Sequence, residues 1–242
     1  MMPKQNKAME TLTRINKRMA ELGLCSRREA DELIKAGQVR VNGKKAKLGQ
    51  SVSSGDTIDI VASQAPKQYL AYYKGRGIIT HSPAAGETDI ATRLKADYGL
   101  EGVYPLGRLD KDSEGLMLLT DDGRLTAPLL DPENNIEKTY EVWVDKPLTG
   151  AFLQKLEHGV NIEGYTTKPA TAVRKSDQRF TLTITEGKKH QIRRMCAALG
   201  YQVQSLKRIQ IANIELGQLK PNQYRKLSPS EQKELFARLK LN

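Results

Sequence analysis

One short loop combines residue types that could carry out chemistry. In the stretch Gly107–Lys111, a single carboxylate, Asp110, lies between two cations, Arg108 and Lys111. Cations nearby favour the ionised form of a carboxylate, and this form acts as a nucleophile or a general base. The same composition is also common in surface loops whose Arg–Asp contacts have no catalytic role. The spacing alone therefore leaves both interpretations open.

Cysteine and histidine indicate no metal chemistry. The two cysteines, Cys25 and Cys196, lie far apart and have neither disulfide nor zinc spacing. We expect each to pack as a reduced thiol. His81, His158 and His190 form no metal-binding pattern, and His158 is expected at the end of a helix. The sequence thus predicts a site with no metal and no cofactor.

The elements that must position Asp110 follow from hydrophobic periodicity. A buried strand at Gly115–Thr120 is predicted directly after the loop and is stopped by Asp121–Gly123. Further strands are predicted at Tyr69–Tyr73, 140–144 and 180–184, and helices at Thr88–Ala96, Arg124–Leu130, Gly150–His158, His190–Leu199 and after the Ser228–Glu231 capping box. Strands and helices mix without a regular βαβ period, which predicts an α+β fold.

A smaller module is predicted ahead of this region. A helix carries Leu12, Ile15, Met19 and Leu22 at helical spacing and ends at Gly23. A second helix is predicted to begin with a capping box at Ser26–Glu29 and to stop at Gly37, and it is followed by a hairpin turn at Asn42–Gly43 and a strand at 57–60. The predicted organisation is a flexible tail at 1–10, the module at 11–61, a linker at 62–68 and a larger domain at 69–242.

The charge balance favours a polyanionic partner. The 242 residues contain 39 Lys+Arg and 28 Asp+Glu, a formal net charge of +11. Nucleic acid would release counterions on binding such a chain. Basic residues crowd the small module, where the first turn of the second helix offers Ser26, two guanidiniums and free N–H groups to a phosphate; the predicted contacts are Arg14, Lys17, Arg18, Ser26, Arg27, Arg28, Lys35 and Arg40. An ordinary solvated basic face is the alternative.

The sequence contains no signal for export or for membrane insertion. Its N-terminal residues are polar, and no apolar run approaches the roughly 18 residues of a membrane span. We therefore expect a cytoplasmic protein, a monomer, with no membrane partner.

Three segments of the small module are similar to a known RNA-binding fold. Arg14–Lys17, Cys25–Asp31 and Gly37–Gly43 resemble the S4 domain over about residues 12–60. The resemblance implies two helices that dock on structured RNA.

Three later segments resemble the motifs of pseudouridine synthases. Gly107–Asp110, followed by Ser113–Leu116 and Leu119–Gly123, is similar to their catalytic motif. Glu137–Tyr140 is similar to the second motif and Glu186–Met195 to the third. All three follow an S4-like domain in the order typical of the ribosomal-RNA (RsuA-type) branch, near the F type of large-subunit (23S) enzymes. The resemblance implies a catalytic domain built on a mainly antiparallel sheet.

The resemblance also implies a reaction and roles for residues. The N1–C1′ bond of uridine breaks, the base rotates, and C5 bonds to C1′ without oxidation. Asp110 is implied as the essential carboxylate, which attacks C1′ or C6 or acts as a base on the ribose. Arg193 is implied to pair with Asp110, and Tyr140 to stack on the flipped base and accept the C5 proton. Leu109 and Ile192 are the expected apolar walls of the pocket.

Contacts to the RNA are expected near this pocket as well. Extruding a uridine costs a few kcal/mol, and contacts from Arg108, Arg194, Lys207 and Arg208 to phosphates are expected to offset that cost. One departure from the family stands out. Its members usually carry Asn-Lys-Pro-x-Gly early in the catalytic domain, whereas this chain has Tyr73–Gly77 without the proline. We interpret that motif as structural.

The predicted function is isomerisation of a uridine in ribosomal RNA, with 23S rRNA as the first candidate. The alternatives are a synthase that acts on 16S rRNA or on tRNA, and a non-catalytic RNA-binding protein of ribosome assembly. The expected partner is ribosomal RNA, with tRNA as an alternative, and the substrate is either naked RNA or a ribosomal particle.

Overall fold

A computed structural model describes residues 12–61 and 66–241 of the chain. Two compact units emerge: residues 1–67 with 122–124 form the first, and residues 68–121 with 125–242 form the second. The predicted tail at 1–10 and residues 62–65 of the predicted linker lie outside the described residues.

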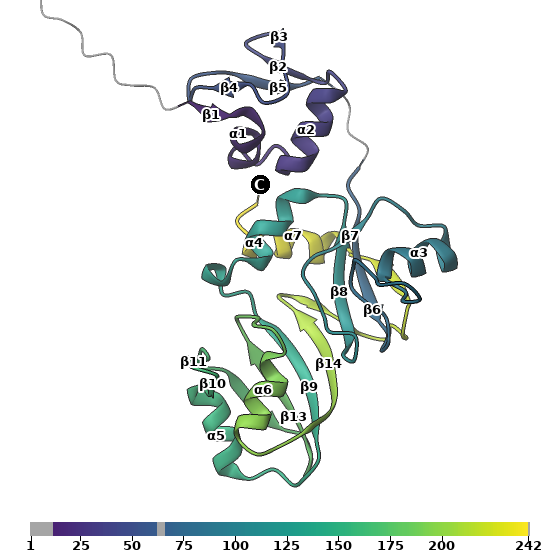
Figure 1. The fold of residues 1–242 in the computed structure, drawn as a ribbon, viewed down its shortest axis with the longest axis vertical. Helices are drawn as coiled ribbons and strands as arrows, with labels where there is room; N and C mark the ends of the chain where they lie inside the picture. The colour runs from purple at the N-terminus through teal and green to yellow at the C-terminus, as the bar shows by residue number, and fades with distance from the viewer. Residues whose placement is uncertain (1–11, 62–65, 242) are drawn as a thin grey trace, which may run out of the picture. The chain divides into compact units, whose positions relative to one another are not determined.

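The first unit contains two helices and short antiparallel strands (Figure 1). Its elements are β1 (Thr13–Arg14), α1 (Ile15–Glu21), α2 (Arg27–Lys35), β2 (Val39–Val41), β3 (Lys44–Lys45), β4 (Ser51–Val52) and β5 (Ile58–Ile60). Ile15, Met19 and Ile34 are buried between the helices and the strands. The predicted first helix is too long, because Leu12 lies before β1 with 66% of its surface exposed.

The cap of α2 is only half of the predicted capping box. The Ser26 hydroxyl accepts a hydrogen bond from the Glu29 N–H at 3.2 Å. The carboxylate of Glu29 pairs instead with the ammonium of Lys67. The local spacing predicts that the Glu29 carboxylate caps the helix, but Lys67, which is distant in the sequence, pairs with this carboxylate instead.

The second unit is organised around one large sheet. Its strands are β6 (Tyr69–Lys74), β7 (Tyr104–Pro105), β8 (Glu114–Thr120), β9 (Lys138–Val144), β12 (Thr171–Arg174), β13 (Arg179–Ile184), β14 (Val203–Ile211), β15 (Ile214–Glu215) and β16 (Tyr224–Lys226), and a separate hairpin pairs β10 (Asn161–Ile162) with β11 (Tyr165–Thr166). The strand order is β12-β13-β9-β14-β8-β6-β16, with β15 beside β14 and β7 beside β8. Among the strand pairs of the described residues, only that of β14 with β8 is parallel. The predicted mainly antiparallel α+β fold is confirmed.

Helices cover the two halves of the sheet differently. They are α3 (Ile90–Tyr98), α4 (Thr126–Leu130), α5 (Gly150–His158), α6 (Gln191–Ala198) and α7 (Pro229–Arg238), with 3-10 turns at Gly123–Leu125 and Pro132–Asn134. Side chains of α5 and α6 pack with those of β9, β13 and β14 in one core, which α3 joins beside β6 and β8. Residues of α4 and α7 pack in a second core against alternate side chains of β6 and β8.

The local signals set most of these bounds. Helix α5 has the predicted bounds, and α3 begins at Ile90 because the Asp89 side chain accepts from the Thr92 N–H at 2.8 Å. The capping box of α7 forms in full between Ser228 and Glu231. None of the helices in the described part of the chain has the length and apolar character to cross a membrane.

Candidate active site and RNA-binding surface

A cleft in the second unit brings the three predicted motifs together. Its volume is about 830 Å³, within the usual range of ligand sites. The lining residues include Gly107–Lys111 from the loop before β8, Lys138 and Tyr140 from β9, and Ile184–Ile192, which runs from the end of β13 through the following loop into the first turn of α6. Segments that are far apart in the sequence therefore line the same cleft.

Asp110 lies on the wall of this cleft with its side chain about one-third exposed. Its Oδ1 is 3.5 Å from Nε2 of His190. Lys111 pairs instead with Glu87 at 2.8 Å, and Arg108 is exposed. Lys111 thus contacts a different carboxylate, and His190 of the third motif contacts Asp110 instead. Sequence reasoning missed His190, although its place directly before Gln191 in that motif was a usable signal.

Arg193 does not pair with Asp110 as the resemblance implies. Its guanidinium donates to the carbonyl of Asp112 and to the hydroxyl of Ser113, both at 3.3 Å, and to the carbonyl of Val203 at 3.1 Å. Within the described residues, the His190 ring is the only Lys, Arg or His side chain that contacts the Asp110 carboxylate. Arg193 therefore donates to the loop that carries Asp110, and it holds the segment two to three residues beyond the Asp110 carboxylate.

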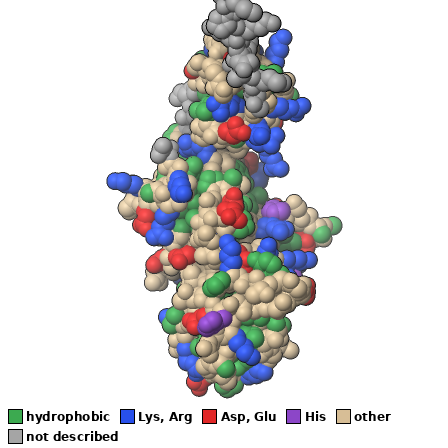
Figure 2. Space-filling model, turned by 90° about the vertical axis from the view of Figure 1, so that its left-hand side faces the viewer, with side chains coloured by type: hydrophobic (Ala, Val, Ile, Leu, Met, Phe, Trp, Pro, Cys, Tyr) green, Lys and Arg blue, Asp and Glu red, His purple; other side chains and the backbone are tan. Residues whose placement is uncertain are grey.

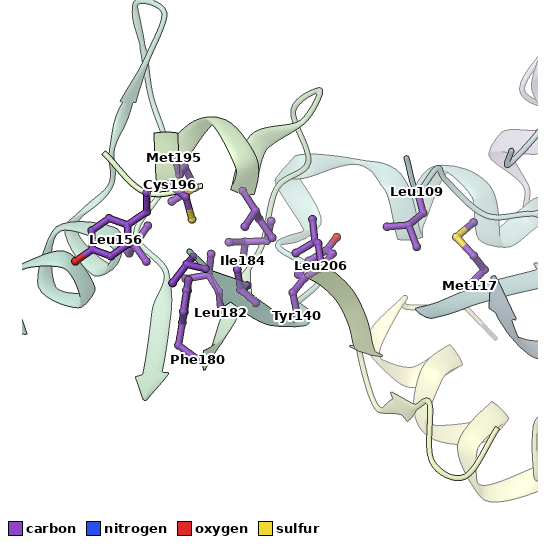
Figure 3. Close-up of a cluster of buried hydrophobic side chains, with 14 of the residues drawn as sticks. Leu109, Met117, Tyr140, Leu156, Phe180, Leu182, Ile184, Met195, Cys196 and Leu206 are labelled. Atoms are coloured by element: carbon purple, nitrogen blue, oxygen red, sulfur yellow. The ribbon is translucent and has the colours of Figure 1, made fainter. Parts of the chain in front are cut away.

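Tyr140 and the two expected apolar walls all line the cleft. Tyr140 on β9 is 8% exposed and lies opposite Leu182 on β13 and Arg208 on β14. In Figure 3, Tyr140 and Leu206 lie between the side chains of the main core and the side chain of Leu109. No hydrogen-bond partner for the Tyr140 hydroxyl is found among residues 12–61 and 66–241, so the hydroxyl remains available to a substrate.

Two cations, Arg208 and Lys138, line the cleft beside Tyr140. Arg208 is 3% exposed, and its Nε donates to the carbonyl of Leu116 at 2.7 Å. Arg208 is predicted as a phosphate contact, and the structure places it in the cleft lining but buried, because strand alternation turns Arg208 to the same face as the buried Leu206. Lys138 donates to the carbonyl of Ile136, and burial, assisted by Arg208, lowers the pKa of Lys138 to about 8.

Of the three other RNA contacts predicted near the cleft, one lines the cleft and two lie outside its lining. Arg108 lines the cleft and is exposed. Arg194 lies outside the lining and pairs with Glu163 of the β10–β11 hairpin at 2.6 Å. The ammonium of Lys207 lies 5.6 Å from the centre of the Tyr73 ring, outside the cleft as well.

Buried Glu186 anchors the loop that carries His190. Its carboxylate accepts from the Tyr165 hydroxyl at 2.5 Å, from the Lys168 N–H at 3.0 Å and from the Gln191 amide at 2.7 Å. Gln191 in turn accepts from the Lys188 N–H at 2.8 Å. These bonds surround His190, whose φ of 53° lies in the left-handed region that a non-glycine residue adopts only when its surroundings hold it there.

The segment that lacks the family's proline supports the Asp110 loop. Lys74 is fully buried, and its ammonium donates to the carbonyl of Ile78 at 2.7 Å. Burial lowers the pKa of Lys74 to about 8, although the charge of Asp110 acts in the opposite direction. The N–H of Gly77 donates to the carbonyl of Lys111 at 2.9 Å. This backbone contact explains how the segment keeps a structural role without proline.

The first unit presents most of its predicted RNA contacts to solvent. Arg14, Lys17, Arg27, Arg28, Lys35 and Arg40 are exposed. Lys17 pairs with Glu21, Lys35 pairs with Glu32, and Arg40 donates to the carbonyl of Gly43. Within the described ranges, the side chains of Arg14, Arg27 and Arg28 make no hydrogen bond or ion pair, and Ser26 and Arg18 are half-buried. On the face drawn in Figure 2, Lys and Arg side chains are interspersed with Asp and Glu.

No group of three or more His, Cys, Asp or Glu side chains suited to a metal ion occurs in the part of the chain that the structure describes. Both cysteines are buried, and burial raises the pKa of each thiol to about 12.

Comparison with known proteins gives a consistent result. Residues 68–198 match the RNA pseudouridylate synthase family model, and residues 13–58 match the S4 domain model. The dual-specificity RNA pseudouridine synthase RluF of Escherichia coli (strain K12) is 36% identical over 94% of this chain and 79% of its own. The ribosomal large subunit pseudouridine synthase B of Bacillus subtilis (strain 168) is 37% identical over 93% of this chain and 96% of its own. A crystal structure of a pseudouridylate synthase superimposes with a TM-score of 0.69 at 32% identity, covering 92% of this chain and 99% of the other.

The second unit has a mixed sheet and a cleft in which three separated motifs meet, and an S4 domain precedes it in the sequence. These features define a class of RNA-modifying enzyme. The chain belongs to the RNA pseudouridylate synthase family, in its RsuA-type branch.

Proposed function

We propose that this enzyme converts a uridine of 23S ribosomal RNA to pseudouridine, with Asp110 as the essential carboxylate. The observation that carries the proposal is the position of Asp110, which lies partly exposed on the wall of a cleft that Tyr140 also lines. The similar enzyme of Bacillus subtilis is named for the large ribosomal subunit. A basic S4 domain suits a structured RNA.

The geometry supports a division of labour within the cleft. A flipped uridine placed between Asp110 and Tyr140 has the carboxylate available to attack C1′ or C6 or to act as a base on the ribose. Tyr140 offers a ring for stacking and an unpaired hydroxyl that can accept the C5 proton. Leu109 and Ile192 are apolar lining that keeps water from the reacting atoms. Arg193 holds the backbone of the Asp110 loop. We propose that the enzyme acts as a monomer.

The target is tested by mapping pseudouridines in rRNA and tRNA from cells with and without this protein. We expect one position of 23S rRNA to lose its pseudouridine and to regain it when the wild-type protein is supplied. A loss confined to 16S rRNA or to tRNA would contradict the proposed target. Transfer RNA stays the second candidate substrate from the sequence, and the similar RluF enzymes, which are named as dual-specificity RNA pseudouridine synthases, favour testing more than one RNA.

Arg27 and Arg28 are proposed to hold RNA phosphates at the start of α2. Because both are exposed and unpaired within the described residues, replacing both with Ala should leave the fold intact. We expect weaker rRNA binding and a slope of log Kd against log salt reduced by about 2, one for each lost phosphate contact.

Filter binding or fluorescence anisotropy across a salt series measures this slope. Replacing Lys44 and Lys47, two exposed lysines of the same unit that are not among the predicted contacts, with Ala serves as the matched control and should change the slope less. An unchanged slope in the double variant would show that this helix start does not contact phosphate.

A further inference from the structure

Thr80 contacts the backbone of the residue that precedes Asp110. The geometry points to Thr80 as a positioning residue for Asp110, a role that rests on the function proposed above. Thr80 is 5% exposed and lies on the segment between β6 and α3. It lines the cleft together with Leu109 and Asp110.

One hydroxyl makes two hydrogen bonds to Leu109. Oγ1 of Thr80 donates to the Leu109 carbonyl at 2.8 Å and accepts from the Leu109 N–H at 3.1 Å, and both bonds are buried. Oγ1 therefore holds the peptide groups on both sides of the Leu109 Cα. The second of these peptide groups joins Leu109 to Asp110. Its orientation therefore sets the position of the Asp110 Cα and the direction of the Asp110 side chain.

Most other hydrogen bonds to the Asp110 loop lie after Asp110, including those from Arg193 to Asp112 and Ser113. The loop runs between β7 and β8, and Gly107 adopts a left-handed φ of 85° before it. After Asp110, the carbonyl of Lys111 accepts from Gly77, and the carbonyl of Asp110 accepts from Ser113 at 3.1 Å. Thr80 supplies the matching restraint on the side before Asp110.

Thr80 is itself firmly held. Its neighbour Ile79 donates to the carbonyl of Thr88 at 2.9 Å and accepts from the N–H of Ile90 at 3.0 Å. These bonds attach the segment to the first turn of α3, whose Ile90 is buried in the core. The restraint on Asp110 thus passes through Thr80 to a packed helix. A displacement of about 1 Å in a catalytic group can cost on the order of 10²-fold in rate.

The test compares three enzymes, namely wild type, Thr80→Ser and Thr80→Val. Serine keeps the hydroxyl, whereas valine has nearly the shape of threonine but leaves the Leu109 N–H and carbonyl without this partner. We expect Thr80→Val to lower the single-turnover rate by about 10- to 100-fold while KM changes by less than about threefold. Thr80→Ser should retain more than about one-third of the wild-type rate, as expected when the hydroxyl restraint is kept.

Release of tritium from C5 of labelled uridine in an rRNA fragment measures the rate, and anisotropy measures RNA affinity. Equal losses in the two variants, an unchanged rate in Thr80→Val, or a change in KM alone would overturn the role of Thr80. If Thr80→Val fails to fold, Thr80→Cys replaces it, because a thiol is only a weak donor and acceptor. The single-turnover rate of Thr80→Cys should then lie below that of Thr80→Ser. A Cys rate equal to the Ser rate would overturn the inference.

Asp110→Asn, assayed alongside, separates this inference from the proposed function. If Asp110→Asn is active, the proposed function fails. If Asp110→Asn is inactive and Thr80→Val has the wild-type rate, only the role of Thr80 fails.

Discussion

Replacing Asp110 with Asn is expected to abolish pseudouridine formation and to leave RNA affinity within a few-fold of wild type. Asn has the shape of Asp but cannot act as a nucleophile or a base at neutral pH. The side chain is partly exposed, and its contact with His190 is 3.5 Å long, so little folding stability depends on the charge. Tritium release from C5 and anisotropy with the same rRNA fragment measure the two quantities.

Asp112→Asn is the matched control, since Asp112 lies two residues away in the same loop and is exposed. It contacts Arg193 through its backbone carbonyl, which the substitution keeps. We expect this control to have close to wild-type activity. Activity retained in Asp110→Asn, or lost equally in both variants, would mean that the loop does not act through the carboxylate of Asp110.

Tyr140→Phe is expected to slow the chemical step by about 10²- to 10⁴-fold, the usual contribution of a positioned acid or base. Phe keeps the ring that packs in the core and can still stack on a base, whereas the hydroxyl available to a proton is lost. RNA affinity should therefore change little. Single-turnover rates at saturating enzyme isolate this step from binding and product release.

Tyr201→Phe provides the control for loss of a buried tyrosine hydroxyl. Its hydroxyl donates to the carbonyl of Pro147 at 3.1 Å, and the residue is outside the cleft lining. We expect a small loss of stability without a change in rate. A Tyr140→Phe enzyme as fast as wild type would restrict Tyr140 to stacking and assign the C5 proton to another acceptor.

Signals within a few residues of one another predicted the fold well. The Ser228–Glu231 capping box and the span of α5 depend on local spacing, and the structure has both. The alternation around Tyr140 predicted a strand with Tyr140 inward, and its side chain is buried. Strand β14 was not predicted, because its Lys and Arg side chains obscure the apolar alternation.

Partners that come from distant parts of the chain were not predictable. Glu29 pairs with Lys67 instead of closing its own helix cap, and Asp110 meets His190 instead of its neighbour Lys111. Sequence reasoning identified Arg208 as a cation near the site but did not predict that it is buried. Its burial follows from the central position of β14, which only the strand order reveals.

The central position of β14 also sets when the enzyme can first work during synthesis. Strand β14 lies between β9 and β8 in the sheet. The two halves of the sheet therefore join only after residues 203–211 have been synthesised and have paired with both strands. Such distant pairings slow folding, because the intervening chain must first be ordered. A nascent chain released before β14 would contain Asp110 and Tyr140 without the strand that joins them. We expect truncated translation products to have the S4 sequence but no isomerase activity.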